Sequence, residues 1–327
     1  MNRRDFLATV AATGALSVLD PAYLAAKERI AAGESPERPV PRRRYGRAED
    51  KLSIIGFGGV TVKDVAPETA ADYVAEAVDR GVNYFDVAPT YGNAQERLGP
   101  ALKPYRDWCF LACKTTERDA AGSARELEES LRLLQTDHVD LYQLHAITTL
   151  EDVERVFARG GAMETFEKAR RDGKTRYLGF SAHSEEAAHA ALDRFDFDSL
   201  LFPFGFPIWL QGGFGPSVHK RASEAGKGIL AIKAMAHQKL LAGAKRSGRR
   251  WNKAWYEPFD ELDKVALGLR FTLHLPVAAM IPPGHWELVE MALGLAQSGA
   301  LVPLNENERK TIEEIARKSA PIFSRHA

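Results

Sequence analysis

Several common sequence features are missing from this chain, and each absence excludes a class of protein. Lysine and arginine total 44, as do aspartate and glutamate, so the formal net charge is +0 and no nucleic-acid surface is indicated. No G-x-G-x-x-G motif follows an early strand, which argues against a Rossmann dinucleotide fold. The histidines lack the H-x-H or H-E-x-x-H spacing of metal ligands, so no metal site is expected.

The chain is also poor in cysteine. Its two cysteines, Cys109 and Cys113, lie in the apolar run CFLACK. Four residues along a strand span roughly 13 Å, which exceeds the reach of a disulfide. Alternation along the strand places both thiols on the face opposite Lys114. We therefore expect two small buried side chains that pack against outer helices, without a disulfide.

The N-terminus lacks an apolar run long enough to anchor the chain in a bilayer. Residues 8–19 are mildly apolar but shorter than the roughly 20 residues that a membrane-spanning helix needs. Arg3, Arg4 and Phe6 precede this stretch and small residues follow it, an arrangement that resembles a twin-arginine export signal. We expect a signal peptide at 1–30, a proline-rich linker at 31–42 and one folded domain at 43–327. An amphipathic helix with two incidental arginines is the alternative.

Such a signal has consequences for location. Twin-arginine export carries folded proteins, often ones that acquire a cofactor in the cytoplasm. The signal therefore predicts a bacterial protein of the periplasm or cell envelope, with the twin-arginine export machinery as a partner. No stable membrane insertion is expected after export.

Beyond the linker, short apolar runs alternate with amphipathic stretches eight times. Strands are expected at 53–57, 83–86, 109–114, 139–144, 176–180, 199–203, 229–233 and 277–281. Helices are expected between and after them at 67–80, 94–101, 122–135, 161–172, 184–194, 215–226, 260–273 and 286–297. Eight such units predict an α/β fold of the (β/α)8 TIM-barrel class, and Glu306–Lys318 adds an extra C-terminal helix.

Four polar residues stand at or just after the carboxyl ends of the apolar runs: Asp86, Tyr91, Lys114 and His145. The carboxyl ends of barrel strands meet at one rim. A tyrosine hydroxyl normally has a pKa near 10, which a neighbouring ammonium lowers, while a carboxylate keeps that ammonium charged and oriented. We therefore expect Tyr91 to act as a general acid, with Lys114 lowering its pKa and Asp86 anchoring Lys114. His145 would orient and polarise the substrate.

Taken singly, three of these residues also fit ordinary structural roles. Asp86 would cap the next segment, Tyr91 would be a loop aromatic, and His145 would be a core histidine with its hydrogen bonds satisfied. Lys114 is harder to explain in this way, because a lysine that ends a buried strand must reach solvent or find an acid. The four residues in this order, on neighbouring strand ends, favour a common site.

The segment that holds Asp86 and Tyr91, YFDVAPTYGNAQERLG, resembles the signature of the aldo-keto reductase family. LACKTT, DLYQLH and GKTRYLGFS resemble its next three landmarks, and RRRYGRAEDKLSIIGFGG resembles its N-terminal β-hairpin and first barrel strand. The resemblance extends from about Arg43 to about Gln297. It implies an enzyme that interconverts an aldehyde, ketone or sugar carbonyl with an alcohol by hydride transfer. The implied cofactor is NADP, with NAD as the alternative.

The resemblance further implies that the dinucleotide lies across the mouth of the barrel. The corresponding contacts in this chain are Gly58, Gly59, Asp86, Ser181, His183, Phe204, Lys233, Met235, Gly284 and Glu290. The chain departs from the family pattern where Ala182 replaces an Asn, Leu201 replaces a Gln and Met291 replaces a second Asn. Two of these assignments have alternatives, since Gly58 and Gly59 also suit a tight turn and Lys233 also suits a lysine that reaches solvent.

The departures leave two other functions open. One is a dinucleotide-binding barrel that acts as a sensor or partner subunit with little turnover. The other is a cofactor-independent enzyme that uses the acid-base residues for an elimination or isomerisation. The sequence specifies neither the substrate nor the physiological direction of the reaction.

Overall fold

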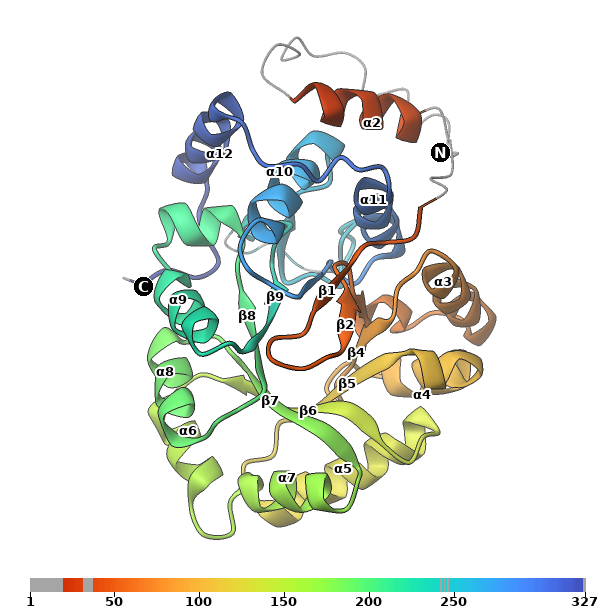
Figure 1. Ribbon diagram of the computed structural model, residues 1–327, viewed down its shortest axis with the longest axis vertical. Helices are drawn as coiled ribbons and strands as arrows, with labels where there is room; N and C mark the ends of the chain where they lie inside the picture. The colour runs from red at the N-terminus through yellow and green to blue at the C-terminus, as the bar shows by residue number, and fades with distance from the viewer. Residues whose placement is uncertain (1–19, 32–37, 242, 244, 246, 326–327) are drawn as a thin grey trace.

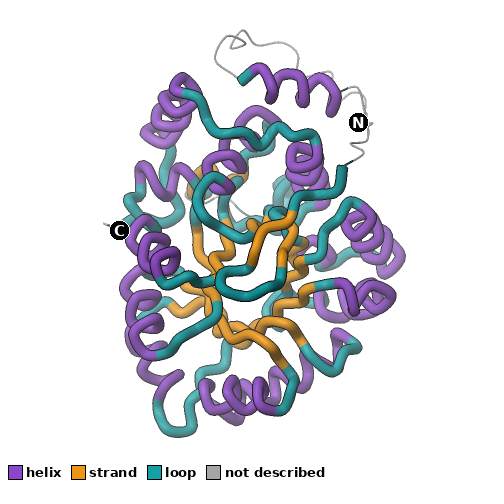
Figure 2. The backbone as a smooth tube through the Cα atoms, in the orientation of Figure 1, coloured by secondary structure: helices purple, strands orange, loops and turns teal. Residues whose placement is uncertain are grey.

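The computed structural model describes residues 20–31, 38–241, 243, 245 and 247–325. Eight parallel strands form one sheet, which a ring of helices surrounds (Figures 1 and 2). Along the chain these strands are β3 (Phe57–Gly58), β4 (Tyr84–Asp86), β5 (Phe110–Thr115), β6 (Val139–Ile147), β7 (Thr175–Ala182), β8 (Ser199–Pro203), β9 (Gly228–Ile232) and β12 (Ala279–Ile281). Their order in the sheet follows their order in the sequence, as the predicted TIM barrel requires.

The first and last strands close the barrel through a short stretch that precedes β3. The amide of Gly56 donates to the carbonyl of Met280 at 2.8 Å, and the amide of Met280 donates to the carbonyl of Ile54 at 2.9 Å. The next two residues, Phe57 and Gly58, pair with β4 instead. The expected first strand at 53–57 therefore divides between two neighbours, and its regular part is shorter and begins later than predicted.

The expected helices are all present, with ends within three residues of the prediction. They are α3 (Pro67–Asp79), α4 (Ala94–Leu102), α5 (Ala120–Leu134), α7 (Ala162–Arg171), α8 (Glu185–Arg194), α9 (Pro216–Glu224), α10 (Leu262–Leu273), α11 (Trp286–Gln297) and α12 (Glu306–Lys318). Helix α5 shows why the pattern works, because its leucines at 127, 131 and 134 are buried against the sheet. The Asp119 side chain caps this helix by accepting from the amide of Gly122 at 2.8 Å.

Several shorter elements were not expected. Helix α6 (Leu150–Phe157) follows β6 and begins where the Thr149 hydroxyl accepts from the amide of Asp152 at 3.0 Å. Strands β10 (Ala236–Lys239) and β11 (Tyr256–Pro258) form a separate antiparallel pair after β9. The remaining short helices are η2 (Gly59–Val62), η3 (Lys103–Trp108) and η4 (Pro207–Gln211). The β10–β11 pair matters for function, because Lys253, shortly before β11, contacts His285 and Thr61 at the barrel mouth.

A β-hairpin covers the amino-terminal end of the barrel, as the family resemblance implies. Strands β1 (Arg42–Arg44) and β2 (Lys51–Ser53) pair antiparallel, and in Figure 1 they lie across the centre of the sheet. Tyr45 and Leu52 of this hairpin are fully buried in the apolar cluster that fills the interior of the barrel. Since this end is plugged, polar groups at the strand ends face the opposite, carboxyl-terminal mouth.

The strand β5 shows the alternation that was expected. Phe110 and Ala112 belong to the interior cluster, whereas Cys109 and Cys113 belong to the cluster between sheet and helices. Both cysteines are buried free thiols. Lys114 shares the inward face with Phe110 and Ala112, which directs it to the barrel mouth.

A helix also precedes the linker, within the segment expected to be a signal peptide. Helix α2 (Pro21–Ala31) lies beside α10 and α11 in Figure 1. Tyr23 is fully buried, its hydroxyl donates to Asp263, and Lys27 forms an ion pair with Asp263 at 2.8 Å. Arg3 and Arg4 lie outside the described residues, as does 32–37 of the linker, so the domain boundaries stay predictions. No helix in the described part of the chain has the length and apolarity to cross a membrane.

Candidate active site

The Asp86–Lys114 pair lies at the base of the barrel mouth, on the adjacent strands β4 and β5. The ammonium of Lys114 donates to Oδ1 of Asp86 and to the carbonyl of Val87 at 3.3 Å. The second carboxylate oxygen, Oδ2, accepts from the amide of Gln143 at 3.1 Å and from the hydroxyl of Tyr84 at 3.3 Å. All of these side chains are buried, so Asp86 is held by three donors and holds Lys114 in one orientation.

Tyr91 lies above this pair in the turn that follows β4. Its ring centroid is 5.2 Å from the ammonium of Lys114. The His145 ring, from β6, meets the Tyr91 ring edge-on at 5.7 Å between centroids. The structure therefore brings together the phenol, ammonium, carboxylate and imidazole that the sequence placed at strand ends.

The pKa of Tyr91 differs from the expected direction. Burial raises it, and the opposing effect of the Lys114 charge and hydrogen bond does not outweigh that increase. Burial also lowers the pKa of Lys114, but the charges of Asp86 and Tyr91 more than compensate, so the net pKa of Lys114 is raised. At neutral pH the phenol thus keeps its proton beside a charged ammonium, which is the starting state for a general acid.

His145 is neutral at the mouth of the barrel. Burial lowers its pKa to about 3, with smaller contributions from the charges of Lys114, His183 and Arg118. Nδ1 of His145 lies 3.4 Å from the Thr90 hydroxyl oxygen. When that hydroxyl donates to Nδ1, the remaining proton of the neutral ring resides on Nε2, which can donate to a substrate oxygen.

The backbone around His145 is irregular. The pairing of β6 with β7 shifts between Leu144 and Ile147, and Ala146 has a φ of 53°, which a residue with a Cβ rarely adopts. The Ser181 hydroxyl accepts from the amide of Ala146 at 2.7 Å. The Arg118 guanidinium donates to the carbonyl of His145 at 2.9 Å and pairs with Asp152. Ser181 and Arg118 thus fix the bulge that presents the imidazole.

Four residues with a part in this geometry were not recognised from the sequence: Tyr84, Gln143, Arg118 and Asp152. Tyr84 and Gln143 lie on predicted strands, two positions before Asp86 and His145. Because alternate residues of a strand share one face, this spacing was a usable signal that they point into the barrel. Nothing local indicates the role of Arg118, which depends on a helix, α6, that was not predicted.

Several expected cofactor contacts also have structural roles. The Ser181 hydroxyl is engaged with the backbone of β6, as described above. Phe204 is fully buried, with its ring against Phe202 and Trp209. Met235 is likewise fully buried. A ligand that stacks on the ring of Phe204 would have to displace these neighbours, so the packing role fits the geometry better.

The expected glycine contacts are explained by close packing. A Cβ at Gly58 would lie 2.8 Å from Cγ2 of Ile281, and one at Gly59 would lie 2.7 Å from Cγ2 of Val87. A Cβ at Gly284 would lie 2.5 Å from Cγ1 of Val60. Side chains therefore fill the space next to these glycines. Glu290 lies on α11, where its charge contributes to the raised pKa of Tyr73 on α3.

Two expected contacts do present polar groups at the mouth, His183 and Lys233. The His183 ring stacks on Phe323 at 5.0 Å, and burial, with a smaller effect of Lys233, lowers the His183 pKa to about 4. The ammonium of Lys233 lies 4.5 Å from the ring centroid of Tyr256 and 5.1 Å from that of Trp255. The rim therefore runs from Tyr91 through two neutral imidazoles to a second ammonium.

The residues present fit the phosphate half of a dinucleotide better than its amide half. Helix α11 begins at the mouth with His285 as its N-cap residue, and no described side chain caps it, so its amino end has the polarity that favours an anion. The segment before β11 crosses there, since the Lys253 amide donates to Nε2 of His285 at 3.0 Å and its ammonium to the carbonyl of Thr61 at 2.9 Å. On the amide side, Leu201 belongs to the interior apolar cluster and offers no hydrogen bond.

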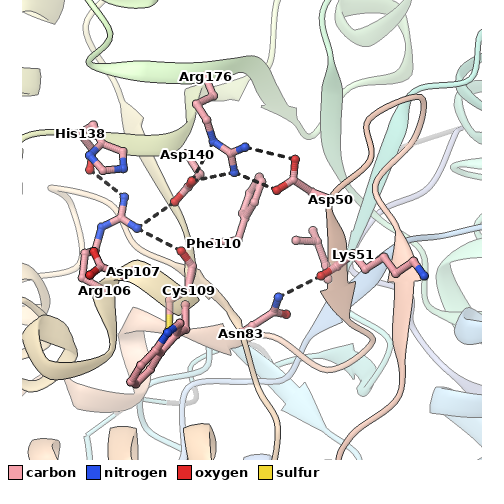
Figure 3. Close-up of a pocket in the computed structure, with 12 residues that line it drawn as sticks. Asp50, Lys51, Asn83, Arg106, Asp107, Cys109, Phe110, His138, Asp140 and Arg176 are labelled. Carbon is pink, nitrogen blue, oxygen red and sulfur yellow. Dashed lines mark hydrogen bonds and ion pairs between the residues drawn. The ribbon is translucent and has the colours of Figure 1, made fainter.

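A cavity of about 400 Å³ lies at the other end of the barrel, beside the hairpin (Figure 3). Four of its charged side chains pair with one another. Arg176 bonds Asp50 and Asp140, both at 2.9 Å, and Arg106 pairs with Asp140 at 3.1 Å. No acid-base residue of the mouth lines this cavity. Among the described residues, no group of three or more His, Cys, Asp or Glu side chains is arranged to hold a metal ion.

Comparison with known proteins agrees with this geometry. The model of the aldo/keto reductase family matches residues 54–319. Over 313 residues the chain is 24% identical to the uncharacterized oxidoreductase YqkF of Bacillus subtilis, covering 87% of this chain and 99% of that protein. It is 32% identical over 149 residues to the aldo-keto reductase YhdN of Bacillus subtilis, covering 41% of this chain and 43% of YhdN.

A solved structure shares the same architecture. The holo form of aldo-keto reductase AKR11C1 from Bacillus halodurans superimposes with a TM-score of 0.64 at 22% identity, covering 86% of this chain and 98% of that chain. At that identity the likeness supports the fold, whereas the family model covers most of the chain. The chain belongs to the aldo/keto reductase family, a family of NAD(P)-dependent oxidoreductases.

Proposed function

We propose that this protein interconverts a small-molecule carbonyl compound and its alcohol, with Tyr91 as the general acid in the reductive direction. The observation that carries the proposal is the buried Asp86–Lys114 pair beneath Tyr91. A lysine buried in a barrel interior needs a counter-charge, and here that counter-charge also aims the ammonium at a phenol. Family membership supports the same reaction class.

The residues divide the work as follows. A bound nicotinamide supplies or accepts the hydride. Tyr91 donates its proton to the developing alkoxide oxygen, and the Lys114 ammonium stabilises the phenolate that remains. Asp86 keeps Lys114 in place through the reaction. Neutral His145 donates a hydrogen bond to the carbonyl oxygen and orients it, and alcohol oxidation reverses these roles.

We propose NADP as the cofactor, with NAD as the alternative. The amino end of α11 is suited to a phosphate group, and Lys253 crosses beside it. The loss of amide-binding side chains at Ala182 and Leu201 is expected to weaken orientation of the nicotinamide rather than phosphate binding. Separate fluorescence titrations of the purified protein with NADPH and NADH would rank the two cofactors.

Replacement of the phenol tests the catalytic assignment. The Tyr91→Phe variant should lose about 10²- to 10⁴-fold in carbonyl reduction, because the proton donor is removed. Its affinity for NADPH should change little, since the ring shape is kept. Tyr105→Phe, a change of the same kind in η3 at the other end of the barrel, should leave turnover unchanged. Full turnover by the Tyr91→Phe variant would overturn the role assigned to Tyr91.

A dinucleotide-binding sensor or partner subunit is the second candidate, because the amide-recognising side chains are missing. The two functions differ in one measurement. Protein that binds NADPH but fails to consume it across a panel of aldehydes, ketones and sugars would favour the sensor. Steady oxidation of NADPH with any one carbonyl compound would favour the reductase.

We also propose export to the periplasm or cell envelope by the twin-arginine machinery. The support is the sequence of residues 3–7, Arg-Arg-Asp-Phe-Leu, near the start of the chain. Fractionation of cells that produce the wild-type chain or the Arg3→Lys, Arg4→Lys variant tests the proposal. Export of the wild type and retention of the variant is the expected result, whereas identical distribution would contradict it.

A further inference from the structure

Lys233 follows β9 at the barrel mouth and is held in an uncommon backbone conformation. Its φ is 70°, in the left-handed region that a residue with a Cβ rarely adopts. Its carbonyl accepts from the amide of Ala236 at 3.0 Å, and a Cβ at Gly205 would lie 2.2 Å from that carbonyl oxygen. The backbone is thus fixed from both sides, so the side chain starts from a defined position.

Two aromatic rings lie against the ammonium of Lys233, whose side chain is half-buried. It lies over the faces of Tyr256 and Trp255, at 4.5 and 5.1 Å from the ring centroids. Phe323 closes the group, since its ring meets that of Trp255 at 5.8 Å and stacks on His183 at 5.0 Å. These four rings form a box at the mouth, between the β10–β11 segment and the C-terminal residues.

The described residues provide no counter-charge for the ammonium of Lys233. Among the described residues, no carboxylate or hydrogen-bond acceptor pairs with the ammonium of Lys233, and its recorded contacts are with rings. Burial alone lowers the pKa of Lys233 to about 8, with no contribution from an acid. His183 is neutral at pH 7, because its pKa is about 4, and burial raises the pKa of Tyr256. The box therefore carries a net positive charge.

The fully buried cations in the described part of the chain are neutralised. Lys114 pairs with Asp86, Arg270 with Glu308, and Lys227 with Asp196. The arginines of the hairpin cavity in Figure 3 are paired as well. A cation that is partly withdrawn from water without an anion costs free energy, of which cation–π contacts return only part. A ligand that brings its own negative charge would remove this cost.

We propose that Lys233 is the centre of an oxyanion-binding subsite at the barrel mouth, which takes a carboxylate or phosphate group that the substrate carries remote from its carbonyl. It rests on the proposed function and deepens it by adding a charge requirement to the substrate. The subsite is distinct from the amino end of α11, where the cofactor phosphate is proposed to bind. Two imidazoles, His145 and His183, separate this subsite from Tyr91 along the rim.

Anion binding without turnover tests the subsite itself. Inorganic pyrophosphate and succinate are titrated separately into the full-length protein and followed by calorimetry and by tryptophan fluorescence, to which Trp255 contributes. Lys233→Met should weaken binding of the anion by about tenfold or more, because a charge-assisted bond is lost, and Lys233→Arg should retain most of it. Lys239→Met removes an exposed lysine of the same strand pair and should bind like the wild type.

Two outcomes of these anion titrations would overturn the proposal. One is the absence of millimolar binding of either anion to the wild type, and the other is equal binding by wild type and a folded Lys233→Met variant. Because neither readout involves hydride transfer, they are independent of the proposed function. Tyr91→Phe should abolish reduction and leave anion binding intact, so failure of the subsite and failure of the reductase assignment are distinguishable.

A second pair of measurements identifies the source of the oxyanion. 4-Carboxybenzaldehyde and methyl 4-formylbenzoate differ in one charge, and the dissociation constants for NADPH and NADH report the cofactor. If the substrate supplies the anion, Lys233→Met raises KM about tenfold for the acid and not for the ester. If the dinucleotide supplies the anion instead, both cofactor dissociation constants rise by that factor and the ratio of the two KM values stays constant, which would overturn the proposal.

Discussion

Gln143 tests how the acid-base centre is held, because one polar atom of its side-chain amide is hydrogen-bonded to Asp86 and the other is buried without a partner among the described residues. Nε2 donates to Oδ2 of Asp86 at 3.1 Å, whereas Oε1 is buried without a partner among the described residues. The Gln143→Leu substitution removes both at nearly constant volume. We therefore expect it to separate stability from activity.

The structure gives the size of each effect. Loss of a hydrogen bond to a charged acceptor costs about 1.5–3 kcal/mol, and removal of an unsatisfied buried carbonyl returns about 1–3 kcal/mol. The free energy of unfolding should thus change by only about 1 kcal/mol. Asp86 is left with Tyr84, at 3.3 Å, as the one donor to Oδ2, so its carboxylate and Lys114 become less well oriented. We expect kcat to fall roughly tenfold, which corresponds to about 1.4 kcal/mol of transition-state stabilisation.

The assay combines urea denaturation with steady-state reduction of one aldehyde between pH 6 and 9. Gln95→Leu is the matched control, because Gln95 is buried and donates to Ser130 at 2.9 Å and to the Cys113 thiol at 3.4 Å, on the face of the sheet opposite Lys114. That variant should lose stability and keep its kcat. Unchanged kcat in a folded Gln143→Leu variant would refute the idea that this amide positions Asp86.

Three further outcomes follow from the buried charges and contacts. Asp86→Asn should lower the free energy of unfolding by about 3–5 kcal/mol, because it leaves Lys114 buried without its anion, and the additional change Lys114→Met should restore part of that loss. Urea denaturation in which the effects of the two substitutions simply add would contradict this coupling. The pKa values of His145 and His183 are lowered to about 3 and about 4, so these imidazoles take up protons in the unfolded chain before they do so in the folded protein as the pH falls below 6.5. The free energy of unfolding from urea denaturation should therefore decrease from pH 6.5 to 4, by at most about 1.4 kcal/mol per pH unit and site, and it should decrease less in His183→Asn. A flat profile would refute this reasoning. Deletion of residues 1–31 should lower Tm by about 5 °C relative to deletion of 1–19, because it removes the buried Tyr23, whose burial contributes roughly 2 kcal/mol to the free energy of unfolding. Equal Tm values would show that α2 adds no stability.

The regular part of the fold was predictable because its pattern is repeated. Each strand is a short apolar run between amphipathic stretches, and eight repeats admit few architectures other than a closed parallel barrel. The first strand was misplaced because its residues serve two neighbours, which no local pattern reveals. The β10–β11 pair was missed because its segments are short and lie about 20 residues apart, so its pairing depends on packing against the mouth.

The acid-base residues were predictable for a different reason. Strand ends fix the positions of Asp86, Lys114 and His145 with little freedom, so residue type and location suffice. The cofactor contacts depend on which atoms the chain has already used. Ser181 resembles a free hydroxyl in the sequence, yet the bulge at Ala146 takes it, and that bulge is visible only in three dimensions.

The mouth of the barrel contains two ammoniums in opposite environments, a fully buried one at Lys114 and a half-buried one at Lys233. Lys114 forms an ion pair with Asp86, whose carboxylate two further donors hold, so the Lys114 ammonium serves to orient and stabilise Tyr91. Among the described residues Lys233 contacts only aromatic rings, so its charge stays available to a ligand. An anionic group that entered the mouth would be attracted weakly to Lys114, whose charge Asp86 neutralises, and strongly to the unneutralised ammonium of Lys233. Burial, with smaller effects of the two ammoniums, keeps the imidazoles of His145 and His183 neutral. The charge of Lys233 would therefore orient a carbonyl compound with its anionic group at Lys233 and its carbonyl at Tyr91.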